Sequence, residues 1–356
     1  MQKLNLLVLF GGVSPEHEVS LRSAESVLRN LDTEKFRVIP VGITKEGQWR
    51  YFGAEDYSLL PKGEWMNDPS CCRAVLSPAR GEGLWLFEDA GVKNEKIDAM
   101  FPVLHGENGE DGSIQGLAQL AGIPCVGPGV AASATGMDKC LTKLVADEAQ
   151  VRQAAWLLVT ADQLAHDEDA AVERVEEKFR YPVFVKPAGT GSSVGVGKAK
   201  DEHALHAALR EAAKYDRKVL VEEFIDGREI EVAVLGNDEP IASVCGEIDS
   251  GAEFYDYEAK YITDSAQLYI PARIEKDVAE RVRRAAVKIY SALGCTGLSR
   301  VDFFVTAKGD VIFNEINTLP GFTSISMYPK LFEATGVPYK ELLTRLVEYA
   351  VEARHG

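Results

Sequence analysis

The sequence predicts a protein of α/β and α+β units, with a doubly wound α/β domain at its N-terminus. Strand-like and helix-like patterns alternate over the first third of the chain, and residues 300–317 have the pattern of a β-hairpin. The chain has 356 residues, which suffices for two or three domains with separate cores. Hydrophobic residues make up 46% and charged residues 26%, as in an ordinary soluble globular protein.

The N-terminal unit begins with a continuous apolar run over residues 4–10, typical of a strand that is buried on both faces. Ser14 and Pro15 follow as the expected N-cap and first-turn residue of an amphipathic helix. The other elements expected here are strands over 36–43 and 97–104, a helix over 114–121 that ends at Gly122, and an irregular insertion over 53–95.

Two further units are expected after residues 127–128. The second contains a helix over 139–149, a strand over 181–186, a glycine-rich loop over 189–195 and a helix over 203–215. The third contains strands within 231–236 and 240–248, a helix over 276–293, the hairpin 300–317 and a closing helix over 342–350.

The hairpin carries the most informative polar residues. Side chains two apart on a strand share a face, so Asp302 on the first strand and Glu315 with Asn317 on the second are expected to converge. Two carboxylates and an amide oxygen form an oxygen-only site that suits Mg²⁺, which takes its remaining ligands from phosphates and water. The alternative is a solvated edge of two ordinary strands. Burying an acid within an apolar strand without a partner is costly, which favours the metal site.

The loop over residues 189–195 (GTGSSVG) follows an apolar strand that ends on Lys186. Glycines let backbone N–H groups face an anion, so the loop is a candidate lid over a triphosphate, and a plain turn is the alternative. No GK[ST] follows it, and its glycines do not fit a dinucleotide fingerprint. Lys186, and with less weight Lys139, are the candidate cations for the phosphates.

Composition excludes several classes of function. With 39 Lys and Arg against 55 Asp and Glu, the net charge is −16, which argues against nucleic-acid binding. The six Cys show no metal-ligand spacing and are expected to be reduced. The N-terminal apolar run is too short for a signal peptide, and no stretch is long enough to span a membrane. A cytoplasmic location is therefore expected.

Taken together, these motifs resemble the ATP-grasp superfamily, and within it the D-alanine–D-alanine ligase family. The order, spacing and content of the matching segments agree over almost the whole chain. The matching segments are FGGVSPEHEVS (10–20), HGENGEDGSIQG (105–116), MDK (137–139), FVKPAGTGSSVGV (184–196), EEFIDGREIEVAVLG (222–236), FYDYEAKY (254–261), RVDFF (300–304) and NEINTLPGFTSISMYP (314–329).

The resemblance implies an ATP-grasp architecture with an N-terminal domain over 1–127, a central domain over 128–221 and a C-terminal domain over 222–356, with ATP between the last two. The implied reaction is ATP-dependent ligation of two D-alanines through an acyl phosphate, for peptidoglycan precursor synthesis. ATP and two Mg²⁺ ions, replaceable by Mn²⁺, are the implied substrate and cofactor. The implied ATP-binding residues are Lys139, Lys186, Ser193, Glu222, Phe224, Ile225, Glu229 and Lys260, and the metal ligands are Asp302, Glu315 and Asn317.

For the amino-acid substrates, the resemblance implies that Glu16 binds the ammonium of the first D-alanine, for which helix capping is the alternative role. His105 would lie by that substrate, although an ordinary polar loop residue is the alternative for it. Arg300 and the Gly321 N–H would stabilise the oxyanion, and Ser326 would bind the carboxylate of the second D-alanine. A triad of Glu16, Ser192 and Tyr261 would join the domains on closure. The group that deprotonates the attacking amine stays open, with Tyr261 as a candidate.

Alternatives remain within and outside the family. Relatives that make D-alanyl–D-lactate tend to replace the tyrosine at position 261, so its presence favours an amine acceptor, yet D-lactate or D-serine ligation stays open. A non-catalytic nucleotide-binding module would be expected to lack a metal ligand, Arg300 or a phosphate lysine, and none is missing. A dehydrogenase would need GxGxxG after the first strand, where this chain has GGVSPE. The family also implies a homodimer.

Overall fold

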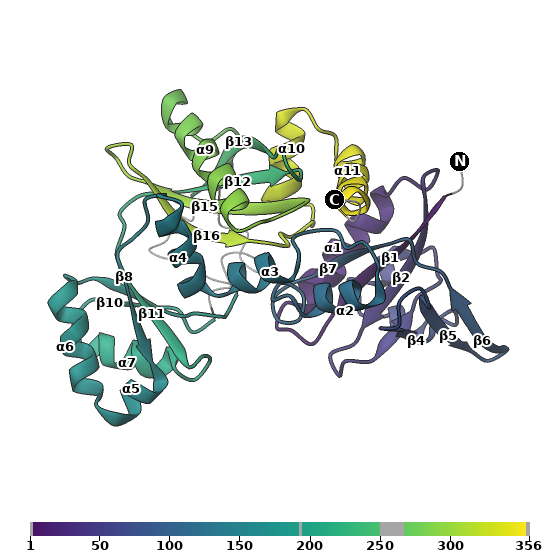
Figure 1. Ribbon diagram of the computed structural model, residues 1–356, viewed down its shortest axis with the longest axis horizontal. Coiled ribbons are helices and arrows are strands. Elements are labelled where there is room, and N and C mark those ends of the chain that lie inside the picture. Colours follow the sequence, from purple (N-terminus) through teal and green to yellow (C-terminus); the bar gives the residue numbers. More distant parts are fainter. Residues whose placement is uncertain (1–2, 192–193, 250–266, 354–356) are drawn as a thin grey trace.

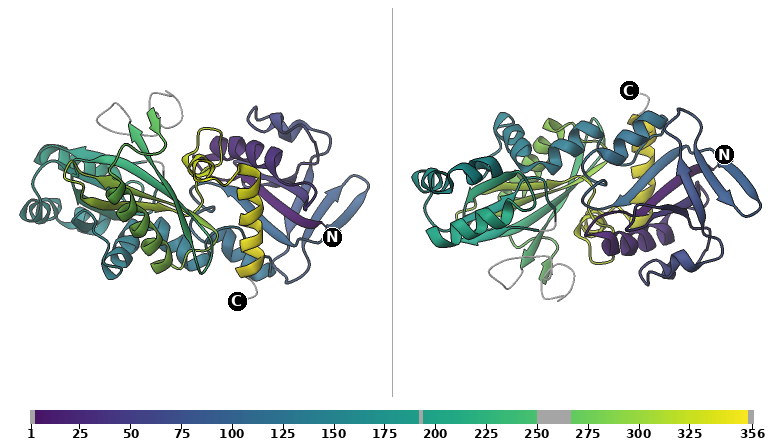
Figure 2. Two further views of the ribbon diagram at one scale, coloured as in Figure 1. Left: turned by 90° about the horizontal axis from the view of Figure 1, so that it is seen from above. Right: turned by 90° about the horizontal axis from the view of Figure 1, so that it is seen from below.

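The computed structural model describes residues 3–191, 194–249 and 267–353. Within these ranges the strands form three sheets, and helices pack on each of them (Figure 1). The N-terminal sheet lies at one end of the molecule and the other two sheets at the opposite end (Figure 2). None of the helices in the described ranges combines the length and apolar character needed to span a bilayer.

The N-terminal sheet has a parallel centre, β2-β1-β7, which confirms the predicted doubly wound domain. Helix α1 (His17–Asn30) covers one face and α2 (Ser113–Ala121) the other, so the apolar run of β1 is buried on both sides. Gly11 ends β1 with φ +85°, and a Cβ there would lie 2.2 Å from the Ile43 carbonyl oxygen. In order across the sheet, the strands are β6 (Gly91–Glu95), β5 (Leu84–Glu88), β4 (Cys72–Leu76), β3 (Trp49–Tyr51), β2 (Phe36–Ile43), β1 (Leu4–Gly11) and β7 (Ala99–Leu104).

Two predictions for this unit are wrong. Residues 53–95 are not irregular: after two 3₁₀ turns, η1 (Tyr57–Leu59) and η2 (Trp65–Asn67), they form β4, β5 and β6, which extend the sheet with antiparallel strands. Ser14 is not the N-cap of α1, because that position belongs to Glu16. The Ser14 hydroxyl instead donates to the carbonyl of His105 at 2.8 Å, an interaction that local helix signals cannot reveal.

The second sheet is antiparallel and forms the central part of the chain. Valines on β9 and β11 pack under the helices α6 (Glu168–Lys178) and α7 (Glu202–Ala212). The glycine-rich loop joins β9 to β10 and therefore lies between two antiparallel strands. The strand order is β10 (Gly197–Ala199), β9 (Val183–Pro187), β11 (Lys218–Glu223) and β8 (Trp156–Thr160), and the short helix α5 (Ala161–His166) follows β8.

The third sheet contains the predicted hairpin. Its apolar face packs against α9 (Lys276–Ala292) and also against α3 (Val130–Met137) and α4 (Lys139–Glu148), which precede the central sheet in the chain. The strand order is β14 (Gln267–Tyr269), β13 (Ile241–Asp249), β12 (Arg228–Leu235), β15 (Leu298–Val305) and β16 (Val311–Asn317).

The two ends of the chain share one hydrophobic core. Helices α10 (Met327–Thr335) and α11 (Tyr339–Ala353) contribute Leu331, Leu343 and Leu346 to the cluster that contains Leu6 and Val8 of β1. In Figure 2 the yellow C-terminal helix lies beside the purple first strand. The last segment of the chain thus packs against the N-terminal sheet.

Candidate active site

A cavity of about 760 Å³ is lined by residues of the central and third sheets and by residues of the N-terminal unit that lie outside its strands. Every predicted site residue in the described part of the chain lies on its wall, whereas Ser192, Ser193, Lys260 and Tyr261 fall outside the described residues. The predicted residues on the wall are Glu16, His105, Lys139, Lys186, Glu222, Phe224, Ile225, Glu229, Arg300, Asp302, Glu315, Asn317, Gly321 and Ser326.

The hairpin β15–β16 has the register that the alternation predicted. Asp302 lies opposite Glu315 across the two strands, and Arg300 lies opposite Asn317. The apolar residues between them, including Val301 and Phe303, point into the core under α9. One extra residue on β16 after Phe313 shifts the register next to the polar pairs. The two carboxylates are therefore neighbours on the face that lines the cavity.

These oxygen donors fit a magnesium site in which the phosphates of a bound substrate supply the remaining ligands. Among the described residues, His, Cys, Asp and Glu form no group of three or more that could hold a metal ion alone. Mg²⁺ commonly binds through one or two carboxylates and takes its other ligands from substrate phosphates and water. Asp302 and Glu315 supply that number, and the Asn317 side-chain oxygen, which accepts the Leu319 N–H at 3.1 Å, lies beside them.

A buried cluster of charge surrounds Glu222 at the end of β11. Lys143 Nζ lies 2.5 Å from one carboxylate oxygen of Glu222, and Lys186 Nζ lies 2.7 Å from the other. Burial alone would raise the pKa of Glu222, but the two ammonium groups prevail and lower it to about 2. Burial works against the charge of Lys186, yet the Glu222 carboxylate raises its pKa. Glu222 and Lys186 therefore stay ionised next to the cavity.

Beside this cluster lies an aromatic slot. The rings of Phe184 on β9 and Phe224 after β11 are stacked with centroids 6.0 Å apart, and Lys198 Nζ lies 4.3 Å from the centroid of Phe224. Lys139, the first residue of α4, donates from Nζ to the Thr190 carbonyl at 2.6 Å and so ties the helix to the glycine-rich loop. Burial lowers the pKa of Lys139. This side of the cavity offers a planar apolar slot next to lysines.

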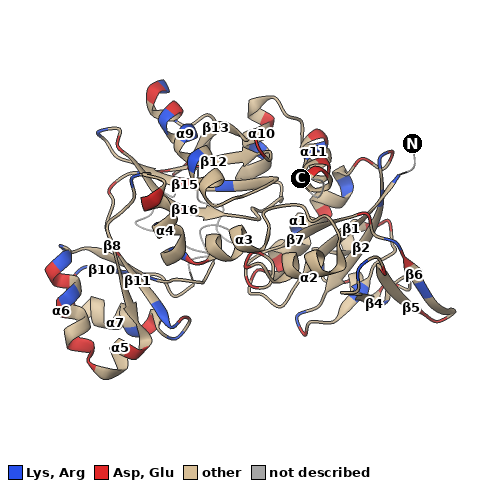
Figure 3. Ribbon diagram, in the orientation of Figure 1, with Lys and Arg blue, Asp and Glu red and all other residues tan. Residues whose placement is uncertain are grey.

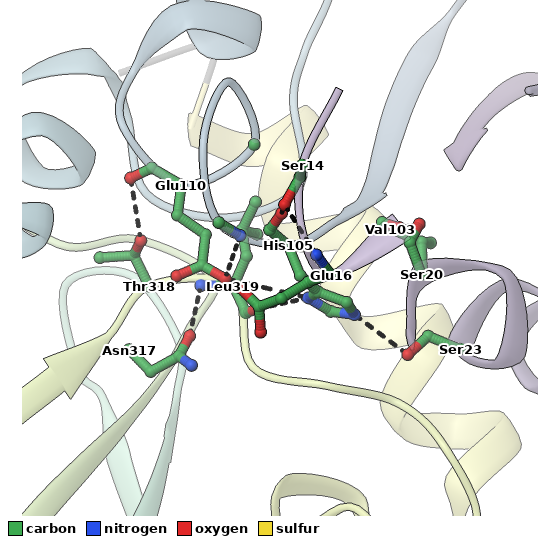
Figure 4. A network of polar contacts seen from close by, with 12 residues as sticks. Ser14, Glu16, Ser20, Ser23, Val103, His105, Glu110, Asn317, Thr318 and Leu319 are labelled. Carbon is green, nitrogen blue, oxygen red and sulfur yellow. Dashed lines mark hydrogen bonds and ion pairs between the residues drawn. The ribbon is translucent and has the colours of Figure 1, made fainter. Parts of the chain in front are cut away.

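The N-terminal domain contributes a separate polar network (Figure 4). Glu16 holds the N-cap position of α1, where its side chain makes no capping hydrogen bond. A Cβ added at Gly106 would lie 2.8 Å from Glu16 Oε2, and one at Gly191 would lie 3.5 Å from it. Its carboxylate thus lies between the loop after β7 and the glycine-rich loop.

His105 and Glu110 lie at the centre of Figure 4. Glu110 accepts the Gly106 N–H at 3.1 Å, and its carboxylate is 3.9 Å from His105 Nδ1. Burial, aided by the nearby charge of Glu16, raises the pKa of Glu110 to about 8, whereas burial lowers the pKa of His105. Both groups are therefore mostly neutral near pH 7.

Family models match nearly all of the chain. The model described as "D-ala D-ala ligase N-terminus" covers residues 5–128, and the one described as "D-ala D-ala ligase C-terminus" covers residues 145–348. The chain belongs to the D-alanine–D-alanine ligase family. This membership supports ATP as a substrate and agrees with the enzyme class that the sequence predicted.

Relatives of this ligase family are similar over their full lengths. The D-alanine–D-alanine ligase of Acetivibrio thermocellus is 50% identical, with 98% of this chain and 96% of that protein covered. That of Caldicellulosiruptor bescii is 49% identical, with 99% and 96% covered. Among solved structures, the VanG D-Ala:D-Ser ligase of Enterococcus faecalis has a TM-score of 0.90 at 40% identity, with 98% of this chain and 100% of that chain covered. The D-alanine–D-alanine ligase of Coxiella burnetii has a TM-score of 0.87 at 33% identity, with 100% and 96% covered.

Several polar residues in or next to this ligase's cavity were not predicted from the sequence. Lys143 follows Lys139 by four residues, so the shared helix face was an available signal. Glu110 stands within the matched segment 105–116, but nothing local predicts its burial. Glu231, whose carboxylate lies 3.2 Å from Arg300, alternates with apolar residues on β12, and an acid in such a strand was also a signal.

Proposed function

We propose that this chain is an ATP-dependent D-alanine–D-alanine ligase that forms D-alanyl–D-alanine for peptidoglycan precursors. The observation that carries the proposal is the single cavity, on whose wall the metal-type carboxylates, the lysines, the aromatic slot and the polar network of α1 all lie. Family membership supplies the reaction class, and the cavity supplies the residues for each step.

ATP is proposed to bind between the central and C-terminal sheets. Phe224 and Ile225 would line the adenine slot, with Glu222 and Glu229 beside the polar groups of adenine and ribose. The phosphates would lie against Lys139 and Lys186, aided by Ser193 and Lys260. Two Mg²⁺ ions, or Mn²⁺ in their place, would be held by Asp302, Glu315 and Asn317 and would neutralise the charge on the β- and γ-phosphates.

The first D-alanine is proposed to place its ammonium near Glu16 and its carboxylate near the γ-phosphate. Transfer of the phosphoryl group to that carboxylate gives an acyl phosphate and ADP. The amine of the second D-alanine then attacks the acyl carbon, loses a proton, and displaces phosphate as the peptide bond forms. Arg300 and the Gly321 N–H would stabilise the oxyanion of the tetrahedral intermediate.

The acceptor subsite is proposed to lie in the same loop as the oxyanion donor. A Cβ added at Gly321 would lie 2.8 Å from Ser326 Oγ, so the two residues are in contact. Ser326 would bind the carboxylate of the second D-alanine, and His105 would lie by the first. Ser192 and Tyr261 would join Glu16 in closing the site against water, which would otherwise hydrolyse the acyl phosphate.

We further propose the domain boundaries 1–127, 128–221 and 222–356, a homodimer and a cytoplasmic location. Nucleic acid is not a proposed partner. The net charge is −16, and Lys and Arg are interspersed with Asp and Glu, as on α6 and α9 in Figure 3.

Phosphate release with ATP and Mg²⁺ tests the proposal, with D-alanine alone compared with D-alanine plus D-lactate or D-serine, and each product identified by mass. Turnover on D-alanine alone, giving the dipeptide and lost in Glu315→Ala, is the expected result. The similarity to a D-Ala:D-Ser ligase makes D-serine the second candidate acceptor. Phosphate release that depends on D-serine would replace the proposed acceptor, and no turnover with any D-amino acid would contradict the substrate assignment.

A further inference from the structure

The loop that carries Gly321 is held by hydrogen bonds on both sides of the peptide group that contains the Gly321 N–H. That N–H belongs to the peptide between Pro320 and Gly321. The preceding peptide carries the Leu319 carbonyl, and the following one carries the Phe322 N–H. His105 Nδ1 lies 3.2 Å from the Leu319 oxygen, and Ser23 Oγ lies 3.3 Å from the Phe322 nitrogen.

The chemistry of these contacts assigns the protons on the His105 ring. A carbonyl oxygen only accepts, so Nδ1 carries the hydrogen that it shares with Leu319. Because the ring is buried and its pKa is lowered, the ring is neutral and Nε2 is an acceptor. Ser23 Oγ lies 3.0 Å from Nε2 and therefore donates its proton there (Figure 4).

The Ser23 hydroxyl donates one hydrogen bond and accepts another, so its orientation is fixed. Its hydroxyl proton goes to His105 Nε2, and its oxygen accepts the Phe322 N–H. Ser23 is fully buried on the inner face of α1, so water does not compete for either contact. Helix α1 and the loop after β7 thus reach the C-terminal loop through one chain of hydrogen bonds.

The carbonyl group of Phe322 is also bonded, through Tyr339 of α11, whose hydroxyl contacts α1. Tyr339 donates to the Phe322 carbonyl at 3.1 Å, and the Tyr339 hydroxyl lies 3.1 Å from Ser26 Oγ, one turn after Ser23. The Phe322 ring packs edge-on against Phe101 with centroids 5.8 Å apart. Phe322 is therefore fixed through its N–H, its carbonyl and its ring.

We propose that Ser23 and His105 are positioning residues that orient the Gly321 N–H towards the reacting carbonyl of the proposed ligase. His105 acts through the loop, because the two ring nitrogens are bonded to Leu319 and Ser23. This inference rests on the proposed function, which makes the Gly321 N–H an oxyanion donor. Tilting such a donor lowers the rate of the chemical step and leaves substrate binding nearly unchanged.

Steady-state kinetics of Ser23→Ala test the proposal, with Ser20→Ala as the matched control. Ser20 is equally buried on α1, but its hydroxyl serves Val103 and Gly11 and not the loop. Ser23→Ala is expected to lower kcat about tenfold or more with KM values nearly unchanged, because removing an oxyanion donor outright costs about 100-fold or more. Ser20→Ala is expected to keep kcat within about twofold, since surroundings away from the reacting groups do not enter the chemical step.

His105→Asn and the double variant with Ser23→Ala add a second measurement. If the two residues act as one unit, the double variant loses no more than the worse single variant. ¹⁵N NMR of the wild-type imidazoles is expected to show His105 protonated on Nδ1, which decides the network even where a variant fails to fold.

Three results would overturn this inference while leaving the proposed function standing. The first is wild-type turnover with no change of kcat in Ser23→Ala. The second is an additive loss of kcat in the double variant, and the third is a hydrogen on Nε2 of His105 in place of Nδ1. Absence of wild-type turnover with every acceptor would instead overturn the proposed function, and this inference with it.

Discussion

The guanidinium of Arg300 makes two parallel hydrogen bonds to the carboxylate of Asp302, from Nε at 2.8 Å and from Nη2 at 2.7 Å. Its Nε also lies 3.2 Å from a carboxylate oxygen of Glu231 on β12. Burial works against the charge of Arg300, but these carboxylates raise its pKa well above the usual value. A proposed oxyanion donor and a proposed metal ligand thus hold each other in the free enzyme.

Glu231→Gln is expected to raise the Mg²⁺ concentration needed for half-maximal phosphate release, by about fivefold for a coupling of about 1 kcal/mol. When Asp302 leaves Arg300 to bind Mg²⁺, Glu231 still balances the charge of Arg300. The variant removes Glu231 as a partner, so Arg300 holds Asp302 more strongly. Asp310→Asn, in the turn of the same hairpin, serves as the control because Asp310 pairs with Arg152 away from the cavity. An unchanged Mg²⁺ requirement in Glu231→Gln would contradict the expectation.

Lys143→Met is expected to lower the free energy of unfolding by about 3 kcal/mol, because it removes one of the two charges that balance buried Glu222. Lys186 would then be the remaining lysine on that carboxylate and would be drawn towards it. Because Lys186 is proposed to bind the phosphates, KM for ATP should rise. Urea unfolding and ATP titration measure the two effects. Lys214→Met, at an exposed pair with Glu211, should change the unfolding free energy by less than about 0.5 kcal/mol. Equal losses in both variants would refute the role of burial.

Glu95 at the end of β6 provides a pH-dependent contribution to stability. Bonds from Arg37, and then Lys93, outweigh burial and lower the pKa of Glu95 from 4.5 to about 2. A lowered carboxylate pKa stabilises the fold fully above pH 4.5, and this stabilisation is lost as the pH falls from 4.5 towards 2. Allowing for the exposure of Arg37 and Lys93, it amounts to about 1–2 kcal/mol.

Glu95→Gln is therefore expected to be less stable than the wild type at about pH 7, with the difference shrinking at about pH 3. Urea unfolding of both proteins at each pH measures the difference. A difference that stays constant over this range would show that the loss comes from packing and not from charge.

Gly42→Ala and Gly116→Ala are expected to have opposite effects on unfolding. A Cβ at Gly42 would lie 2.3 Å from the buried ring of Trp65, so this substitution should destabilise by about 2 kcal/mol. A Cβ at Gly116, within α2, would meet no atom within 4 Å, so alanine should stabilise the helix by about 0.5–1 kcal/mol. Thermal unfolding at one pH compares the two variants. Stabilisation in both variants would mean that the packing around Trp65 adapts, and destabilisation in both would contradict the open space at Gly116.

Local patterns predicted much of this fold because they act over a few residues. The alternation around Asp302 and Glu315 and the turn between them fix which side chains share a face, and the structure confirms that pairing. The period of α1 and the stop at Gly122, with φ +69°, were equally local. The hairpin therefore follows from local residue patterns alone.

Interactions between distant segments could not be predicted in this way. Ser14 has the residue type of an N-cap, and its oxygen accepts the Glu16 N–H, but the helix begins later and its hydroxyl proton is donated to the carbonyl of His105 in a remote loop. Residues 53–95 contain many turn formers, and their strands are stabilised by pairing with β3 and with one another. Ser23 lies on the apolar stripe of α1, where a serine was a signal, but its partners come from two remote loops.

The core shared by β1 and α11 has a consequence for how the protein is made. The strand that contains Leu6 and Val8 leaves the ribosome long before the helix that supplies Leu343 and Leu346. The part of this core that α11 covers, beside α1, therefore stays exposed until α11 has been made. During translation the N-terminal domain therefore exposes apolar surface to which chaperones can bind. The domain packs fully only after α11 has left the ribosome.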